Sequence, residues 1–194
     1  MTRRTPVHLA IRVRKKTWKL RAKRCFRIVR AALIAASRKL RFRIVHYAIL
    51  GNHLHLIAEG DDTYAVSRAM RGLSIRIARR LNKLMGRRGK VIDERYMLRV
   101  LHDARAVFEA TRYVLNNYRK HAVEWDERPA RDWIDPCSSA RWFAHWAYQP
   151  ARSRDPCPEL ERGIVEPLSE VWAEVWSPFG VIEPSFVPSS PKSI

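Results

Sequence analysis

Cysteine, early prolines and long apolar runs are all scarce in this 194-residue chain. It has three cysteines, Cys25, Cys137 and Cys157, and no CxxC pair, which argues against a zinc knuckle. No stretch approaches the roughly 20 consecutive apolar residues that a membrane-spanning helix needs. The N-terminus, MTRRTPVHLA, also lacks the apolar stretch of a signal peptide. We therefore expect a soluble, cytoplasmic protein with free thiols.

Acidic residues are scarce at the front of the chain. Residues 1–121 hold 31 Lys and Arg against 7 Asp and Glu, a formal charge of +24, whereas residues 122–194 carry −5. A module with this excess repels itself unless an anion is bound, and a polyphosphate is the natural anion. Solubility alone requires far less charge, so nucleic-acid binding is favoured over the lesser alternative, a membrane surface.

The prolines divide the chain at the same place. Pro6 is the only proline before residue 121, and the other ten lie between Pro129 and Pro191. We therefore predict a regular domain over residues 1–123 and a loop-rich C-terminal extension over residues 124–194. The extension holds six of the seven tryptophans. We expect their rings to dock it on the domain, with stacking on unpaired bases as the alternative.

Hydrophobic periodicity predicts the elements of the first domain. Strand-like and β-rich runs predict the first two strands, Gly51-Asn52 predicts a two-residue hairpin with an alternating strand after it, and stripes of period 3.6 predict helices. Asp103 is the expected N-cap of the last helix. The expected elements are strand 6–13, helix 24–40, strands 42–50 and 53–59, helix 64–85, strand 90–101 and helix 104–121. This order predicts an α+β fold, a ferredoxin-like βαββαβ antiparallel sheet with one added helix and a loop-rich tail.

Two histidines follow the predicted hairpin. His53 and His55 lie two residues apart on a strand, so both imidazoles leave the same face of the sheet. Adjacent imidazoles suit one metal ion, although a packed pair of histidines has the same spacing. Glu59 shares that face and is an alternative carboxylate ligand, whereas His8 and His46 are expected to be structural.

The last predicted helix carries a second candidate pair. Tyr113 and Asn117 lie one turn apart and therefore share a face. A phenol hydroxyl and an amide oxygen would project together, and the amide would complete an oxygen-and-nitrogen metal site beside the histidines. His121 follows one turn later and is a candidate neighbour of that site. The pair alone, however, is also what an ordinary helix surface contains.

The predicted helix over residues 64–85 has an apolar stripe on one side and basic residues on the other. We expect these basic residues to contact nucleic-acid phosphates without reading sequence. They are Arg68, Arg71, Arg79 and Lys83.

In combination, these features resemble the single-tyrosine HUH transposases, most closely the REP-associated tyrosine transposases of bacteria. The resemblance covers about residues 6–123 and depends on four ordered motifs. They are Asn52-His53-Leu54-His55-Leu56-Ile57, the basic helix ending at Arg79-Arg80-Leu81-Asn82, Arg95-Tyr96, and Arg112-Tyr113-Val114-Leu115-Asn116-Asn117. The chain departs from the family at Leu50-Gly51, where Met-Pro is common, and at Asn117-Tyr118, where Asn-Pro is common.

The resemblance implies a metal-dependent enzyme that nicks and rejoins single-stranded DNA beside a short hairpin. His53, His55 and Asn117 would be ligands of Mg²⁺ or Mn²⁺, and Tyr113 the nucleophile that forms a 5′-phosphotyrosine. A homodimer is compatible with the family. Two alternatives stay open: a noncatalytic binder of structured DNA or RNA, and a nuclease that activates water and needs an added carboxylate such as Glu59.

Overall fold

A four-stranded antiparallel sheet, in the order β2-β3-β1-β4, forms the centre of the protein. The computed structural model describes residues 4–38, 41–151 and 154–189. The strands are β1 Thr5–Arg12, β2 Phe42–Ile49, β3 His53–Gly60 and β4 Met97–Val100. This strand order and the βαββαβ connectivity confirm the predicted ferredoxin-like α+β fold.

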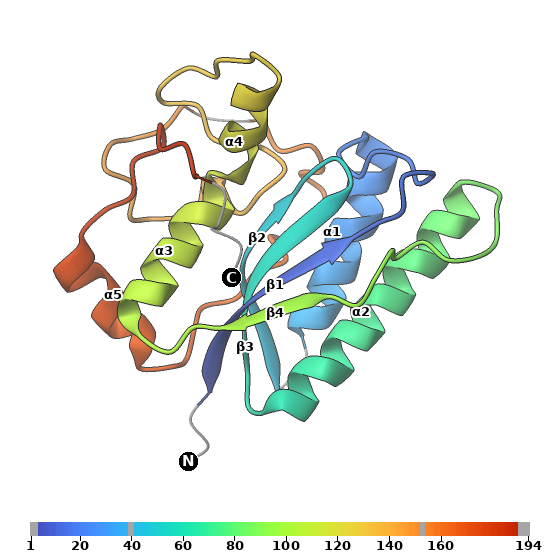
Figure 1. Ribbon diagram of the computed structural model, residues 1–194, viewed down its shortest axis with the longest axis horizontal. Coiled ribbons are helices and arrows are strands. Elements are labelled where there is room, and N and C mark those ends of the chain that lie inside the picture. The colour runs from blue at the N-terminus through green and yellow to red at the C-terminus, as the bar shows by residue number, and fades with distance from the viewer. Residues whose placement is uncertain (1–3, 39–40, 152–153, 190–194) are drawn as a thin grey trace.

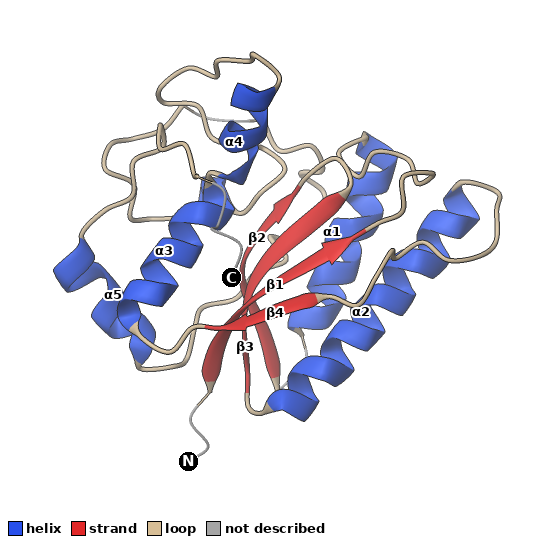
Figure 2. Ribbon diagram, viewed as in Figure 1, coloured by secondary structure: helices blue, strands red, loops and turns tan. Residues whose placement is uncertain are grey.

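Helices cover both faces of the sheet (Figures 1 and 2). They are α1 Lys23–Ser37, α2 Thr63–Leu84, α3 Ala104–Leu115, α4 Asn117–Glu124 and α5 Val171–Phe179, with a 3-10 turn, η1, at Ala140–Trp142. α1 and α2 lie side by side on one face, whereas α3 packs on the other face together with α5 (Figure 1). Within the described ranges, no helix is both long enough and apolar enough to cross a bilayer.

The main apolar core lies between the sheet and the helices α1 and α2. Leu54 and Leu56 of β3 point into it and are fully buried. The stripe predicted on α2 turns inward to meet them, because residues three and four apart share one side of a helix. Its buried members are Val66, Met70, Leu73, Ile77 and Leu81.

The β2–β3 hairpin closes at Gly51-Asn52, as predicted. Leu50 N–H donates to the carbonyl oxygen of His53 at 2.8 Å, which closes the turn. The carbonyl oxygen of Asn52 accepts from Val13 N–H, also at 2.8 Å. The tip of the hairpin is therefore tied to the end of β1, and the first residue of β3 has a fixed position.

The expected strand over residues 90–101 is shorter in the structure, where only β4 pairs continuously with β1. Val13 meets Ile92 through an isolated bridge, two residues from the position that the β1–β4 register gives. The intervening chain bulges, and the Tyr96 hydroxyl oxygen reaches 3.2 Å from Ser67 Oγ on α2. A contact between distant elements thus overrides the strand pattern of this segment.

The helix expected over residues 24–40 is observed as α1, which ends at Ser37. Leu40, the last member of its apolar stripe, lies outside the described residues. Asp103 caps α3 as predicted, because its carboxylate accepts a hydrogen bond from Ala106 N–H at 2.7 Å.

The last predicted helix is not continuous to His121, which corrects the expectation. α3 ends at Leu115 and α4 begins at Asn117, with Asn116 at φ −101° and ψ 8° between them. Asparagine favours a helix less than alanine or leucine does, so the Asn-Asn pair is a natural place for the break. Asn117 follows the break with a fully buried side chain.

Ion pairs hold the C-terminal extension to α1. Arg30 is 1% exposed, contacts Asp155 at 2.5 Å, and donates to the backbone oxygens of Leu160 and Glu161 at 2.8 Å. Three further pairs join this region to the extension: Arg21–Asp135, Arg27–Glu159 and Arg38–Glu161. Acidic residues of the extension therefore neutralise arginines within α1 and at both of its ends.

The tryptophans of the extension mostly dock it on the domain. Trp172 is buried in the second apolar cluster, beside α3, and Trp146 and Trp176 pack against the same cluster. Trp142 packs against the main core. Trp125, in contrast, is 57% exposed at the end of α4.

Candidate active site

The histidine pair lies on the sheet face opposite α1 and α2. His53 and His55 alternate along β3 with the core residues Leu54 and Leu56, so both imidazoles leave the same face. Their ring centroids are 5.1 Å apart, with the rings nearly perpendicular. His55 is buried, whereas His53 is half-buried at the start of β3. The pair thus has one inner and one outer imidazole.

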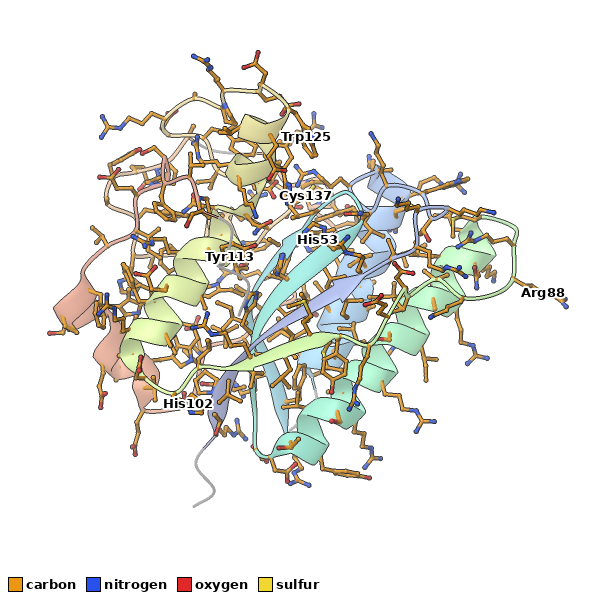
Figure 3. The ribbon with its side chains drawn as sticks, in the orientation of Figure 1. His53, Arg88, His102, Tyr113, Trp125 and Cys137 are labelled. Carbon is orange, nitrogen blue, oxygen red and sulfur yellow. The ribbon has the colours of Figure 1, made fainter. Side chains whose placement is uncertain are left out.

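Tyr113 faces this pair from α3. Its ring centroid lies 5.5 Å from that of His55 in an edge-on contact. Figure 3 shows Tyr113 and His53 in the same region, between α3 and the tip of the β2–β3 hairpin. Residues from a strand and a distant helix therefore converge.

His8 also belongs to the cluster, although the sequence favoured a structural role for it. Its Nε2 atom is 3.0 Å from His55 Nδ1, and its ring lies 5.9 Å from that of Tyr113. Period-two alternation places His8 on one face of β1, but no local pattern reveals that β1 pairs with β3. Only the strand register, with Ala10 opposite His55, brings the two imidazoles together.

In the sequence, Asn117 lies midway between two residues whose rings contact the histidines. Tyr113 precedes it by four residues, and His121 follows it by four with its ring 5.5 Å from that of His53. The Asn117 side chain is fully buried, and both its amide oxygen and its amide nitrogen have no hydrogen-bond partner. A buried amide without partners is costly, so these atoms are suited to a ligand.

Burial favours the neutral imidazole at His8, His53 and His55. Burial, together with the nearby Arg99, lowers the pKa of His8 to about 4. Burial, His121, Arg12 and Lys120 lower the pKa of His53 to about 4. Burial also lowers the pKa of His55 well below its ordinary value, with further contributions from the neighbouring histidines. A neutral imidazole keeps the lone pair that a metal ion requires.

The donor set fits a metal ion only if Asn117 contributes. In the part of the chain that the structure describes, no group of three or more His, Cys, Asp and Glu is arranged to hold a metal. His53 and His55 supply two nitrogens, and the unpaired Asn117 amide supplies a candidate oxygen. Mixed nitrogen and oxygen donors are compatible with Mn²⁺ and Mg²⁺.

Glu59 is engaged elsewhere, which removes it from the candidate ligands. Its carboxylate accepts hydrogen bonds from Leu168 N–H at 2.8 Å, from Ser169 N–H at 3.0 Å and from Ser169 Oγ at 2.7 Å. These three bonds anchor the turn before α5 to the end of β3. A nuclease that uses Glu59 as an added carboxylate has no support in this arrangement.

The basic residues predicted on α2 are exposed, but they lie across the sheet from the histidines. These residues are Arg68, Arg71, Arg79 and Lys83. Figure 3 shows Arg88, just beyond α2, on the opposite side of the molecule from Tyr113. The α2 surface and the histidine cluster are therefore separate sites.

Other cations, which sequence reasoning did not single out, lie near the cluster. Arg12 is opposite His53 in the β1–β3 register, and Arg99 is opposite His8 in the β1–β4 register. Lys120 on α4 lies close enough to affect the pKa of His53. Each is one basic residue among many in the sequence, so only the strand register and the α4 position identify them.

Two other tyrosines, one just before β4 and one on α4, direct their hydroxyls away from the histidines. Tyr96 directs its hydroxyl toward Ser67 on α2, and the Tyr118 hydroxyl donates to Glu127 at 3.0 Å. Among the described residues, Tyr113 is the tyrosine whose ring contacts His55 and His8.

No family model matches the chain, and no curated protein matches it. Among solved structures, the chain is similar to one described as a REP-associated tyrosine transposase bound to a REP hairpin. The match has a TM-score of 0.49 and 19% sequence identity, and it covers 61% of this chain and 69% of that chain. The roles of individual residues are therefore inferred from the geometry of this chain and not from the match.

Proposed function

We propose that the protein nicks and rejoins single-stranded DNA through Tyr113, with Mg²⁺ or Mn²⁺ held by His53, His55 and Asn117. The observation that carries the proposal is the approach of Tyr113 to the imidazole pair, 5.5 Å between the ring centroids of Tyr113 and His55. An ordinary helix surface has no reason to direct a tyrosine at two neutral imidazoles from another layer of the fold.

The residues around the site suit an anionic substrate. Arg12, Arg99 and Lys120 surround the histidines with positive charge. A metal ion held there would draw negative charge from a phosphate oxygen and orient the phosphate. The cations would hold the neighbouring phosphates of the strand, a contact that does not depend on sequence. Single-stranded DNA provides both the phosphate at the metal ion and the neighbouring phosphates.

The reaction conserves bond energy. The Tyr113 hydroxyl oxygen attacks phosphorus, an oxygen–phosphorus bond forms, and the bond from phosphorus to the 3′ oxygen breaks. The phenol loses its proton and the released 3′ oxygen gains one, which leaves a 5′-phosphotyrosine and a 3′-OH. A second 3′-OH then attacks the same phosphorus and releases Tyr113. No ATP is needed, because the phosphotyrosine keeps the energy of the broken bond.

The exposed cations of α2 would hold a different part of the DNA. They lie across the sheet from Tyr113, so they do not line the site of cleavage. A hairpin-bearing strand has a duplex segment as well as a single-stranded one. We assign Arg68, Arg71, Arg79 and Lys83 to phosphates remote from the scissile bond.

A trapping experiment tests the proposal. The protein is incubated with Mn²⁺ and a hairpin-bearing single strand labelled at its 3′ end, because a 5′-phosphotyrosine retains that end. Denaturing gels should show a labelled protein–DNA adduct with the wild type and with Tyr118→Phe. The adduct should disappear with Tyr113→Phe and with a chelator. Tyr118 is a matched control because its hydroxyl bonds to Glu127.

Two outcomes contradict the proposal. Cleavage that persists in Tyr113→Phe without an adduct indicates a nuclease that activates water. A mobility shift without cleavage, across substrates and both metals, indicates a noncatalytic binder of structured DNA or RNA. The formal charge of +24 on residues 1–121 favours this binder as the second candidate function, because charge alone suffices for binding.

A further inference from the structure

Both candidate metal-binding histidines have their Nδ1 atom engaged by a polar neighbour. His53 Nδ1 lies 2.8 Å from Asn52 Oδ1, and His55 Nδ1 lies 3.0 Å from His8 Nε2. The two neighbours come from different places, the hairpin turn and β1. Two unrelated elements thus present a partner to the same ring atom of each imidazole.

The partner of His53 determines where its proton lies. An amide oxygen only accepts hydrogen bonds, so the short contact requires the proton on His53 Nδ1. A neutral imidazole has a single ring proton, and Nε2 therefore carries a free lone pair. Without such a partner, a neutral histidine in water favours the opposite tautomer, which has its proton on Nε2.

His55 and His8 share one proton along their contact. When His55 Nδ1–H donates to His8 Nε2, the Nε2 atom of His55 is free to bind a cation. The reverse arrangement places the His55 proton on Nε2 and blocks that atom. Metal-binding histidines generally donate their second ring N–H to an acceptor, which fixes both the tautomer and the ring orientation.

We propose that Asn52 and His8 are positioning residues that keep the ring protons of His53 and His55 on Nδ1 and so present both Nε2 atoms to one cation. This rests on the proposed function for the identity of the cation, but it does not involve Tyr113. It also gives His8 a role that neither the sequence nor the resemblance assigned.

The backbone holds both positioning residues in place. The Asn52 carbonyl oxygen accepts from Val13 N–H, and the adjacent Gly51 carbonyl accepts from Leu20 N–H, each at 2.8 Å. His8 is fixed by the β1–β3 ladder, which pairs Ala10 with His55 and so places His8 diagonally across the sheet. Backbone hydrogen bonds therefore fix the main chain of both residues.

Imidazole tautomers can be read directly in metal-free protein by long-range ¹H–¹⁵N correlation spectra. We expect both His53 and His55 to carry the proton on Nδ1. Asn52→Leu removes the acceptor and should return His53 to the Nε2–H form, whereas Asn52→Asp keeps an oxygen there and should preserve the wild-type tautomer. An Nε2–H tautomer at either histidine in the wild type would overturn the proposal.

Metal affinity gives a second readout. Calorimetric titration with Mn²⁺ alone should show roughly 10- to 100-fold weaker binding for His8→Phe, which has no acceptor. His8→Gln offers an amide oxygen to His55 Nδ1–H and should bind nearly as tightly as the wild type. His102→Gln, an exposed residue far from the cluster in Figure 3, is the control and should bind like the wild type.

Equal affinities for His8→Phe and His8→Gln would overturn the role of His8, provided that both variants unfold thermally like the wild type. The outcome is separable from the cleavage reaction. Nδ1–H tautomers together with a failed adduct assay would sink the reaction and support the positioning roles. An adduct formed by a protein whose His53 and His55 carry the proton on Nε2 would support the reaction and overturn the positioning roles.

Discussion

The two faces of the sheet differ in chemistry although the same strands build both. Beneath α1 and α2, β3 contributes Leu54 and Leu56, and the space is filled with apolar side chains. On the other face, the same strand contributes His53, His55, Ile57 and Glu59, of which only Ile57 is apolar and joins the second apolar cluster. Along β3, one face is therefore wholly apolar, whereas the other combines an apolar cluster with polar groups whose burial is costly unless something binds them.

This difference shows how a regular strand separates stability from function. Alternation assigns consecutive residues to opposite faces, so a single strand serves both purposes without an irregular loop. The polar groups at the face of His53 and His55 are of two kinds, those with hydrogen-bond partners and those without. Glu59 is satisfied by the turn before α5, whereas the amide of Asn117, from the helix layer over this face, has no partner. The amide of Asn117, which has no partner, thus differs from the carboxylate of Glu59, which anchors the extension.

The largest expected effect is on the stability contributed by the sheet face beneath α1 and α2. Leu56 is fully buried between the sheet and the helices, so Leu56→Ala leaves a cavity and should lower the free energy of unfolding by ~2–5 kcal/mol. Urea denaturation of the metal-free protein measures it. His53→Ala, at the half-buried edge of the polar face, should cost clearly less; equal costs would show that both faces stabilise the fold alike.

The next largest expected effect is a dependence of stability on pH that is caused by the buried His46. His46 packs against Phe143 and Trp172, and burial lowers its pKa to about 3. The unfolded chain takes up a proton near pH 6.5, whereas folded His46 stays neutral to about pH 3. Stability from this residue is therefore complete above pH 6.5 and is lost as the pH falls toward 3, a few kcal/mol in total.

The slope of unfolding free energy against pH measures this effect. Between pH 6 and 4, His46→Gln should reduce the slope by about one proton relative to the wild type. An unchanged slope would mean that His46 is protonated in the folded protein, and that the packing around it is looser than the structure shows.

A smaller effect of opposite sign is expected at Asn117. Asn117→Leu replaces a buried amide without partners by an apolar group of similar size. In the metal-free protein it should raise the free energy of unfolding by ~1–3 kcal/mol and abolish Mn²⁺ binding. Denaturation and calorimetry on one preparation report both quantities. Destabilisation together with intact metal binding would exclude Asn117 as a ligand.

The smallest effects separate the two basic surfaces. Arg79→Ala on α2 and Arg99→Ala beside His8 should each reduce the slope of log affinity against log salt by about one for a hairpin-bearing strand. With a short single strand that has no hairpin, only Arg99→Ala should change the slope. Fluorescence anisotropy at several salt concentrations measures this, and equal effects on both ligands would argue for one continuous binding surface.

Much of the framework was predictable from local sequence. Strand-like runs identify β1 and β2, alternation identifies β3, Gly51-Asn52 marks the hairpin, and the stripe on α2 identifies its buried side. The common face of His53 and His55 follows from alternation alone. These features depend on neighbours within a few residues, which the sequence displays directly.

Other features were misjudged because they depend on distant contacts. The strand over residues 90–101 shortens because Tyr96 turns toward α2. The last helix breaks at Asn116, whose side-chain amide donates to the carbonyl oxygen of Glu183 in the extension at 3.4 Å. Glu59 resembles a ligand on its strand, but the extension, more than 100 residues later, supplies its partners.

The sequence by itself determined the positive charge, the strand and helix periods, and the pairing of two imidazoles on one face, because each is a property of composition or of adjacent residues. The tertiary structure decided which groups meet those imidazoles. Strand register brought His8 within 3.0 Å of His55, and the packing of α3 on the sheet brought Tyr113 to the same place. Register and packing arise from burying the whole apolar surface at once, so no local pattern encodes them.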